Sequence, residues 1–168
     1  MGFPPHSGRP PVRGSVTSLL RSPRETLGGY MILPRLIDKV RLHARGTLPT
    51  EYHPQLLAPE PALDGRFLAF TGLDAGKLRA AILSSHDDAA VLSWVERHGT
   101  PRTDAEKTAW AEAIDAYRPD PERAARRAQN YPTVAARFDV DGMSVFDVID
   151  LDEGRITRPG EAPQTARP

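Results

Sequence analysis

Residues 22–45 decide the fold, and they read SPRETLGGYMILPRLIDKVRLHAR. Pro34 favours a helix start, because its φ is already helical and a first turn does not need its missing N–H. Apolar side chains follow at helical spacing and define one stripe of that helix, namely Leu33, Leu36, Ile37, Val40 and Ala44. Charged side chains alternate with them and are expected on a solvated face, namely Arg35, Asp38, Lys39, Arg41 and Arg45. The stretch therefore predicts an amphipathic helix that Gly46 ends.

The first four residues of this stretch, SPRE at 22–25, have the pattern of a second, shorter helix. Ser22 has the side chain of an N-cap, Pro23 suits the first helical position, and Glu25 stands three residues after the cap. Gly28 and Gly29 would end that helix after little more than one turn. We therefore expect a short capped helix, a glycine turn and then the longer helix.

The rest of the chain carries the same signals of short helices. A proline-rich loop spans residues 47–63, and a short apolar helix at 67–70 precedes Gly72. Capping patterns then mark further helix starts, at Asp74, at Ser85–Asp88, at Thr103–Glu106 and at Ser144–Asp147. Together these signals predict a succession of helices with little else between them.

Two regions near the C-terminus are less regular. Residues 122–129 have helical propensity but few apolar side chains, which predicts a surface helix. After Phe138, Asp141-Gly142 suits a hairpin turn, whereas the pattern at 144–147 caps a helix, which we favour. No segment has the β-branched alternation of a long strand, and no internal repeat is present. The sequence therefore predicts the all-α class, with a single compact domain of five to seven short helices over residues 18–156.

Composition narrows the class of protein further. The chain has 168 residues, 22 basic and 22 acidic side chains, no cysteine and 17 prolines. Equal charges give no net field, the lack of cysteine excludes disulfides and thiol chemistry, and no apolar run reaches the length of a membrane span. Because the sequence near Met1 has no signal-like apolar segment, we expect a cytoplasmic protein. The proline-rich ends, residues 1–17 and 157–168, are expected to be disordered.

Several motifs are similar to those of one bacterial protein family. The longest runs from Ser22 to Lys39 and contains the segments SPRE, LGGY, LPR and IDK. Weaker motifs follow it, at Gly46-Thr47-Leu48, Glu51-Tyr52-His53, Phe67–Gly72, Val91–Trp94 and Asp150–Arg155. In these motifs the chain resembles a family known only as a domain of unknown function, over roughly residues 18–156. The resemblance implies a small helical protein and the extent of its domain, and it brings no activity with it.

The candidate ligand-binding residues cluster in the same N-terminal block. A helix N-terminus carries free N–H groups and about half a positive charge, so a phosphate or carboxylate suits it. The predicted anion-binding patch lies near residues 24–39, is covered by the loop at 52–53, and consists of Arg24, Gly28, Gly29, Tyr30, Arg35, Lys39 and Tyr52. A structural interpretation stays open beside it: a cap, a glycine turn, and an ion pair of Asp38 with Arg35 or Arg41. We favour a binding or interaction module for a small anionic ligand or a protein partner.

Two enzyme classes stay open as alternatives. His53 is of the residue type that most often serves as a general base, and Glu25 or Asp38 could orient it for acid–base or hydrolytic chemistry. His86-Asp87 matches part of the ligand set of metal-dependent phosphohydrolases, although a capping pattern already explains it. The acidic tract at 139–153 lacks the spacing of a calcium loop, and no P-loop or dinucleotide glycine pattern is present. We therefore predict no metal site and no cofactor.

Charge is unevenly distributed along the chain. Residues 1–45 carry eight basic and two acidic side chains (net +6), residues 46–120 seven and twelve (−5), and residues 121–168 seven and eight (−1). The basic groups of the first third are spread out and lack interleaved aromatic side chains other than Tyr30. This distribution argues against nucleic acid as the partner. It specifies no oligomeric state.

Overall fold

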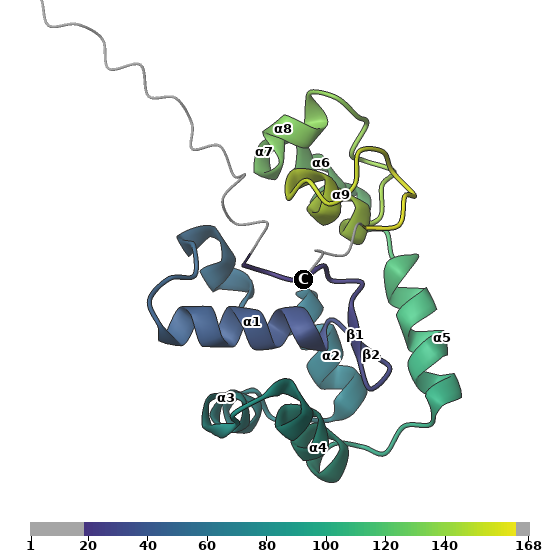
Figure 1. The fold of residues 1–168 in the computed structure, drawn as a ribbon. Helices are drawn as coiled ribbons and strands as arrows, with labels where there is room; N and C mark the ends of the chain where they lie inside the picture. The colour runs from purple at the N-terminus through teal and green to yellow at the C-terminus, as the bar shows by residue number, and fades with distance from the viewer. Residues whose placement is uncertain (1–18, 164–168) are drawn as a thin grey trace, which may run out of the picture.

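The structure is a computed structural model that describes residues 19–163. Within that range the elements are, in chain order, β1 (Thr26–Leu27), β2 (Tyr30–Met31), α1 (Leu33–Ala44), the 3-10 helix η2 (Thr50–Gln55), α2 (Leu63–Thr71), α3 (Ala75–Ser84), α4 (Asp88–His98), α5 (Asp104–Asp115), α6 (Pro121–Ala125), α7 (Arg127–Asn130), α8 (Pro132–Ala135) and α9 (Val145–Asp152) (Figure 1). The predicted helical class is confirmed. The predicted tail at 1–17 lies outside the described residues, and of the other tail the structure describes residues 157–163, without helix or strand.

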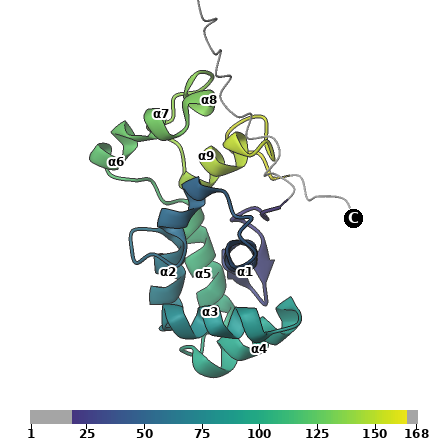
Figure 2. The same ribbon diagram turned by 90° about the vertical axis from the view of Figure 1, so that its left-hand side faces the viewer.

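The helices divide into a large and a small lobe (Figures 1 and 2). The large lobe consists of the hairpin and α1–α5, and the small lobe of α6–α9. Most of the main core comes from the large lobe, but Phe146 of α9 is buried in it as well. A second apolar cluster fills the small lobe, with the buried residues Val134, Val140, Met143 and Val148. Each lobe therefore has a core of its own, and α9 belongs to both.

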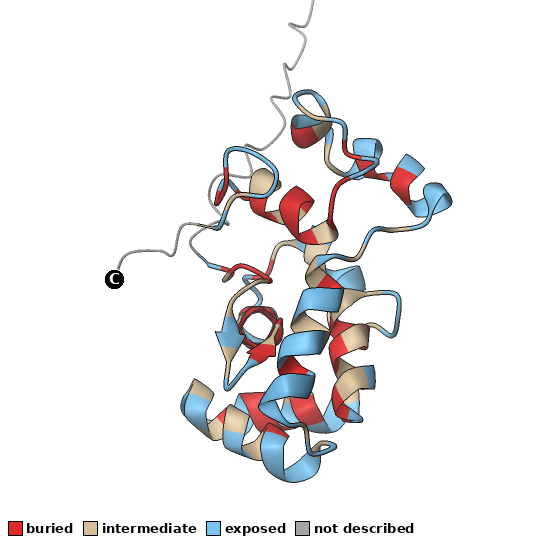
Figure 3. Cartoon of the chain, turned by 90° about the vertical axis from the view of Figure 1, so that its right-hand side faces the viewer, coloured by how far each residue is buried: buried red, intermediate tan, exposed pale blue. Residues whose placement is uncertain are grey.

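Helix α1 runs through the large lobe and is buried on nearly every side (Figure 3). Four residues of its predicted apolar stripe are fully buried, namely Leu33, Leu36, Ile37 and Val40, whereas the fifth, Ala44, is exposed. The prediction that Arg35 and Lys39 lie on a solvated face is wrong, because both are buried. Acidic residues from α9 and from the start of α2 cover this face of α1 and form ion pairs with the two cations.

Residues 22–31 form a turn and a hairpin, so the predicted short capped helix is wrong, whereas the predicted glycine turn is present as the turn of the hairpin. β1 and β2 pair antiparallel with Leu27 opposite Tyr30, and Gly28 and Gly29 join them with φ of 56° and 80°. A two-residue hairpin turn needs positive φ of this kind, which glycine adopts without strain. The glycine pair therefore outweighs the helix-start pattern that precedes it.

Most predicted helix boundaries are confirmed by capping contacts. Three predicted caps each accept a hydrogen bond from the N–H three residues further on, namely Asp74, Thr103 and Ser144. In front of α4 the cap is Asp87 and not the predicted Ser85, whose hydroxyl donates to the carbonyl of Ala81 at the end of α3. The helix predicted at 122–129 is divided between α6 and α7, and the loop predicted at 47–63 contains η2.

Candidate functional site

A cleft of about 660 Å³ opens between the two lobes. One side comes from α1, η2 and the start of α2, and the other from residues 117–131 and α9. Five basic side chains line it, namely Arg35, Lys39, Arg123, Arg126 and Arg127. Ionisable groups that gather in a cleft are typical of a functional site, because burial and neighbouring charges adapt them to chemistry or binding. This cleft is the candidate site.

Arg35 and Glu153 form a buried ion pair in the cleft. Arg35 Nη1 and Nη2 donate to the two carboxylate oxygens of Glu153 at 2.9 and 2.6 Å, and Tyr52 Oη donates to Glu153 Oε1 at 2.8 Å. Burial alone would raise the pKa of Glu153, but the Arg35 guanidinium outweighs it and holds the pKa below its ordinary value. Burial raises the pKa of the Tyr52 phenol, and the charge of Glu153 adds to this effect. Arg155 also forms an ion pair with Glu153 and lowers its pKa further, so at neutral pH the group consists of a carboxylate, two guanidinium groups and a neutral phenol.

Lys39 and Asp64 form a second buried pair in the same cleft. Lys39 Nζ lies 2.5 Å from Asp64 Oδ1, and the side chains are 7% and 0% exposed. The other carboxylate oxygen, Oδ2, accepts a hydrogen bond from the backbone N–H of Leu57 at 2.8 Å. Burial lowers the pKa of the Lys39 amine, and the opposite effect of Asp64 does not restore it.

Arg127 is the one buried cation of the cleft wall without an acidic partner among residues 19–163. Its Nη1 donates to the carbonyl oxygens of Val140 and Met143 at 3.1 and 2.6 Å. Burial lowers the pKa of its guanidinium, although nearby side chains including Tyr131 oppose this effect. The exposed side chains of Arg123 and Arg126 line the wall near it.

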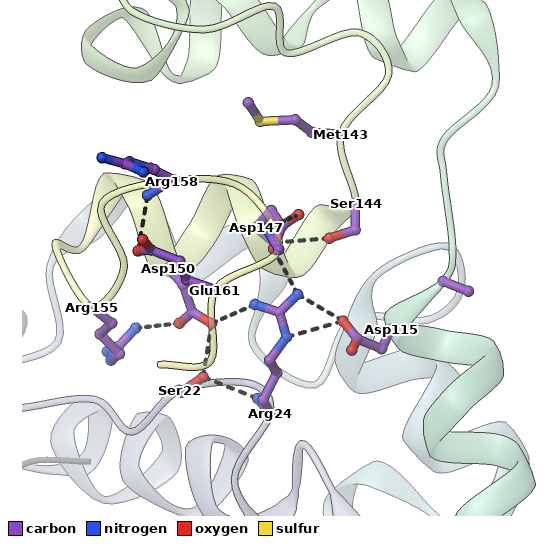
Figure 4. A network of polar contacts seen from close by, with 12 residues as sticks. Ser22, Arg24, Asp115, Met143, Ser144, Asp147, Asp150, Arg155, Arg158 and Glu161 are labelled. Carbon is purple, nitrogen blue, oxygen red and sulfur yellow. Dashed lines mark hydrogen bonds and ion pairs between the residues drawn. The ribbon is translucent and has the colours of Figure 1, made fainter. Parts of the chain in front are cut away.

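A network around Arg24 holds the small lobe in place beside the cleft (Figure 4). The Arg24 guanidinium donates to Asp115 at 2.8 and 3.0 Å, to Asp147 at 2.8 Å and to Asp150 at 3.0 Å. Ser22 Oγ donates to Asp150 Oδ2 at 3.0 Å and accepts a hydrogen bond from the backbone N–H of Arg24. The SPRE segment therefore binds the first and second turns of α9 and the end of α5.

The residues of this network and of the two buried pairs all lie within one stretch of the chain that a family model matches. A model of a domain of unknown function, DUF5069, matches residues 17–155. The chain belongs to the DUF5069 family. No curated protein shows significant similarity to it. No helix of the DUF5069 chain within residues 19–163 is long and apolar enough to cross a membrane.

The seven predicted ligand-binding residues of the DUF5069 chain do not come together as one patch. Arg35, Lys39 and Tyr52 line the cleft. Arg24 lies in the ionic network just described, and Gly28 and Gly29 form the hairpin turn. The hairpin directs the remaining residue, Tyr30, into the main core, where it is 3% exposed and makes edge contacts with two phenylalanine rings.

The structure does not bring the predicted acid–base residues together. His53 is exposed, and its Nε2 lies 2.9 Å from the carbonyl oxygen of Leu48. The Asp38 carboxylate instead accepts three hydrogen bonds from Arg21. Within residues 19–163, no hydrogen bond or ion pair joins His53 to Asp38 or to Glu25.

The metal-dependent alternative finds no ligand set in the described part of the chain. His86 is 85% exposed and pairs with its neighbour Asp87, with 2.9 Å between Nε2 and Oδ2. Among residues 19–163, no group of three or more histidine, cysteine or acidic side chains could hold a metal ion. The chain therefore presents His86-Asp87 as a surface pair next to the N-cap of α4.

Sequence reasoning missed the acidic half of the cleft and its arginine wall. Asp64 follows Leu63 in a proline-rich loop region, and Glu153 belongs to an acidic tract that was tested for calcium spacing alone. Arg127 was assigned to a surface helix, because the segment around it is rich in alanine and arginine. The motif at 150–155 was the one available signal for Glu153, since it is among the segments that resemble the family.

Proposed function

We propose that this chain is a binding module whose ligand is a small anion held in the cleft between the lobes. The observation that carries the proposal is Arg127, which is 6% exposed and donates to two carbonyl groups, with no ion pair to an acidic side chain among residues 19–163. A buried cation without a counter-charge is costly, and a bound anion would offset that cost. The guanidinium has five N–H donors, so donors remain for a ligand beside those that serve the two carbonyl groups.

Two neighbouring guanidinium groups support an anionic ligand. Arg123 and Arg126 line the same wall and make local, exposed ion pairs with Asp120 and Glu122, at 3.5 and 3.2 Å. Exposed pairs of this kind contribute little to stability, so exchanging them for a ligand carboxylate or phosphate has a small cost. Arginine also binds such groups through two parallel hydrogen bonds, which adds specificity.

The size of the cleft favours a small molecule over a macromolecule. Its volume of about 660 Å³ lies within the range typical of metabolite-sized sites. Polar amide side chains, Gln55 and Gln129, line it together with the charged groups and could orient a polar ligand. The proposed ligand is therefore a metabolite with at least one carboxylate or phosphate group.

Calorimetric titration at low ionic strength tests this proposal, with inorganic phosphate, citrate and pyruvate as probe anions. At least one probe is expected to bind, and the double variant Arg123→Ala/Arg126→Ala should bind it about tenfold more weakly because charge-assisted hydrogen bonds are lost. Arg97→Ala is the matched control, since Arg97 is an exposed arginine of α4 that does not line the cleft. The proposal fails if none of the three anions binds, or if Arg97→Ala weakens binding as much as the double variant.

A further inference from the structure

The Lys39–Asp64 pair has features that anion binding alone does not require. Both side chains line the cleft, and both are more than nine-tenths buried. Lys39 Nζ lies 2.5 Å from Asp64 Oδ1, so the carboxylate is in direct hydrogen-bond contact with the amine. A lysine whose purpose is to attract anions usually keeps its ammonium group in solvent, because a hydrated ammonium is a strong point charge. This lysine is placed as a reactive group instead.

The surrounding backbone fixes the Asp64 carboxylate in position. Its second oxygen accepts the N–H of Leu57, whose φ of 51° lies in the left-handed region that a leucine rarely adopts. Such a conformation costs free energy, and it is typical of sites where geometry serves function. Gly65 follows Asp64, and a Cβ at this position would lie 2.2 Å from the backbone N of Glu60. The loop before α2 is therefore packed tightly onto the residue that holds the lysine.

Burial also favours the neutral form of the Lys39 amine, which is the form that a nucleophile needs. Desolvation lowers its pKa, and Arg35 nearby acts in the same direction. A lysine becomes nucleophilic at neutral pH when burial or a neighbouring cation favours its neutral form. Asp64 is within reach to accept the proton that the ammonium group loses.

We infer that Lys39 forms an imine with the carbonyl carbon of a small 2-oxo acid bound in the cleft, with Asp64 as the proton carrier. The inference rests on the proposed function, because the guanidinium wall would bind the carboxylate of that ligand. Lys39 and the three arginines line the same cleft.

The step balances without an added oxidant or reductant. Asp64 takes a proton from the Lys39 ammonium group, and the neutral amine attacks the carbonyl carbon to form a C–N bond. The amine proton moves to the former carbonyl oxygen, which gives a carbinolamine. Asp64 returns its proton to this hydroxyl group, water leaves as the C–O bond breaks, and the nitrogen lone pair forms the C=N bond of a protonated imine.

The chain offers matched controls for a trapping experiment, because its lysines are Lys39, Lys77 and Lys107. Lys77 is exposed on α3 and reports the reactivity of an ordinary lysine. Lys107 is buried, but its Nζ donates to the carbonyl oxygen of Gly28 and lies over the Tyr30 ring, and it does not line the cleft. Its Nζ also lies 3.6 Å from Glu96 Oε1, so it reports a buried lysine with an acidic neighbour outside the cleft.

The experiment incubates the full chain with pyruvate, reduces any imine with borohydride, and maps the adducts by peptide mass spectrometry. Lys39 is expected to be labelled about tenfold more than Lys77 or Lys107, because an activated amine reacts faster than an ordinary one. Asp64→Asn should reduce labelling of Lys39 to the level of Lys77, and Lys39→Arg should remove the cleft adduct. Circular dichroism of both variants shows whether they fold, and the comparison of lysines within the wild-type chain does not depend on them.

Lactate distinguishes this inference from the proposed function, since it has the carboxylate of pyruvate but no carbonyl carbon. If lactate and pyruvate both bind in the cleft but the exposed Lys77 is labelled more than Lys39, the imine inference is wrong and the proposed anion binding stands. If neither acid binds and Lys39 is not labelled, both proposals fail.

Discussion

At the residue scale, the two buried cations of α1 are both neutralised by acidic side chains from other elements. Arg35 binds Glu153, and Lys39 binds Asp64, so that each buried cation of α1 has one acidic partner. A buried ion pair adds little net stability, because desolvation cancels much of its Coulomb attraction, but loss of one partner leaves a buried unpaired charge. Single substitutions at these positions should therefore be far more damaging than their surface counterparts.

The Glu153→Gln variant tests this expectation. The amide keeps the shape of the side chain but leaves the Arg35 guanidinium without a counter-charge, which should lower the free energy of unfolding by about 3 kcal/mol. Urea unfolding at neutral pH measures it. Glu51→Gln is the control, because Glu51 lines the same cleft but is exposed. Equal stability of the two variants would show that the buried pair does not hold the lobes.

The same pair gives a pH dependence with a defined sign. The pKa of Glu153 lies below its ordinary value of 4.5, because Arg35 outweighs the effect of burial. A carboxyl group with a lowered folded pKa contributes stability above its unfolded pKa and loses it as the pH falls through the folded value. The stability difference between wild type and Glu153→Gln should therefore be complete at neutral pH and shrink as the pH falls below 4.5. A difference that stays constant on acidification would contradict this assignment.

At the element scale, the helix α2 depends on a glycine that its sequence pattern does not reveal. Gly65 has helical φ, yet a Cβ there would lie 2.2 Å from backbone atoms of Pro59 and Glu60. Backbone atoms cannot move aside as a flexible side chain can, so Gly65→Ala should destabilise the chain by about 3 kcal/mol through overpacking. Thermal unfolding measures the change.

Gly76 is the control for Gly65, because it also lies near the start of a helix but has room for a Cβ. It lies in the first turn of α3, and the nearest atom to a Cβ there would be a side-chain oxygen of Asp74 at 3.3 Å. Because alanine favours a helix more than glycine does, Gly76→Ala should leave the melting temperature unchanged or raise it. A similar loss in both variants would mean that the close approach at Gly65 does not limit stability.

Local rules predicted those elements whose signals lie within one or two turns. The apolar stripe of α1 and the caps Asp74, Thr103 and Ser144 needed no tertiary information, because periodicity and capping act between neighbours in sequence. The SPRE segment failed as a helix, since the φ values of the two following glycines favour a hairpin. Sequence alone does not show whether the helix-start pattern or the glycine pair has the greater effect, because this depends on what packs against the segment.

The candidate site was predictable in part for the same reason. Arg35, Lys39 and Tyr52 were chosen from a motif and a loop, and they do line the cleft. The acidic partner of Lys39 lies 25 residues further along the chain, and that of Arg35 lies 118 residues further along. No spacing rule connects residues that far apart. Amphipathic periodicity assigned both cations to solvent, because a helix covered on nearly every side by other elements has no single polar face.

At the scale of the whole molecule, polar contacts carry much of the junction between the lobes. Arg24 contacts three carboxylates, of which Asp147 and Asp150 belong to α9. Phe146 supplies the buried apolar link, and the Arg24 guanidinium lies 5.7 Å from the centre of its ring. A cation–π contact of this kind adds to the ion pairs. Arg24 therefore connects the lobes by both types of contact.

The Arg24→Met variant should uncouple the small lobe from the large one. Loss of the guanidinium leaves the fully buried carboxylate of Asp150 with fewer partners, which should cost about 3 kcal/mol. Hydrogen exchange should then accelerate in α6–α9 more than in α1, because the small lobe retains a core of its own but loses its attachment. Arg97→Met on the surface of α4 is the control. Uniform acceleration across both lobes would indicate global destabilisation instead.

The long separation of these partners has a consequence for synthesis of the chain on the ribosome. Arg24 precedes Asp150 by 126 residues, and Ser22 precedes it by 128. At about 5 to 20 residues per second, Asp150 leaves the ribosome roughly 6 to 25 seconds after Arg24 does. The large lobe can fold during that interval, while the cations that await α9 remain unpaired. The cleft is therefore completed last, and a nascent chain stalled before residue 147 would carry the large lobe without it.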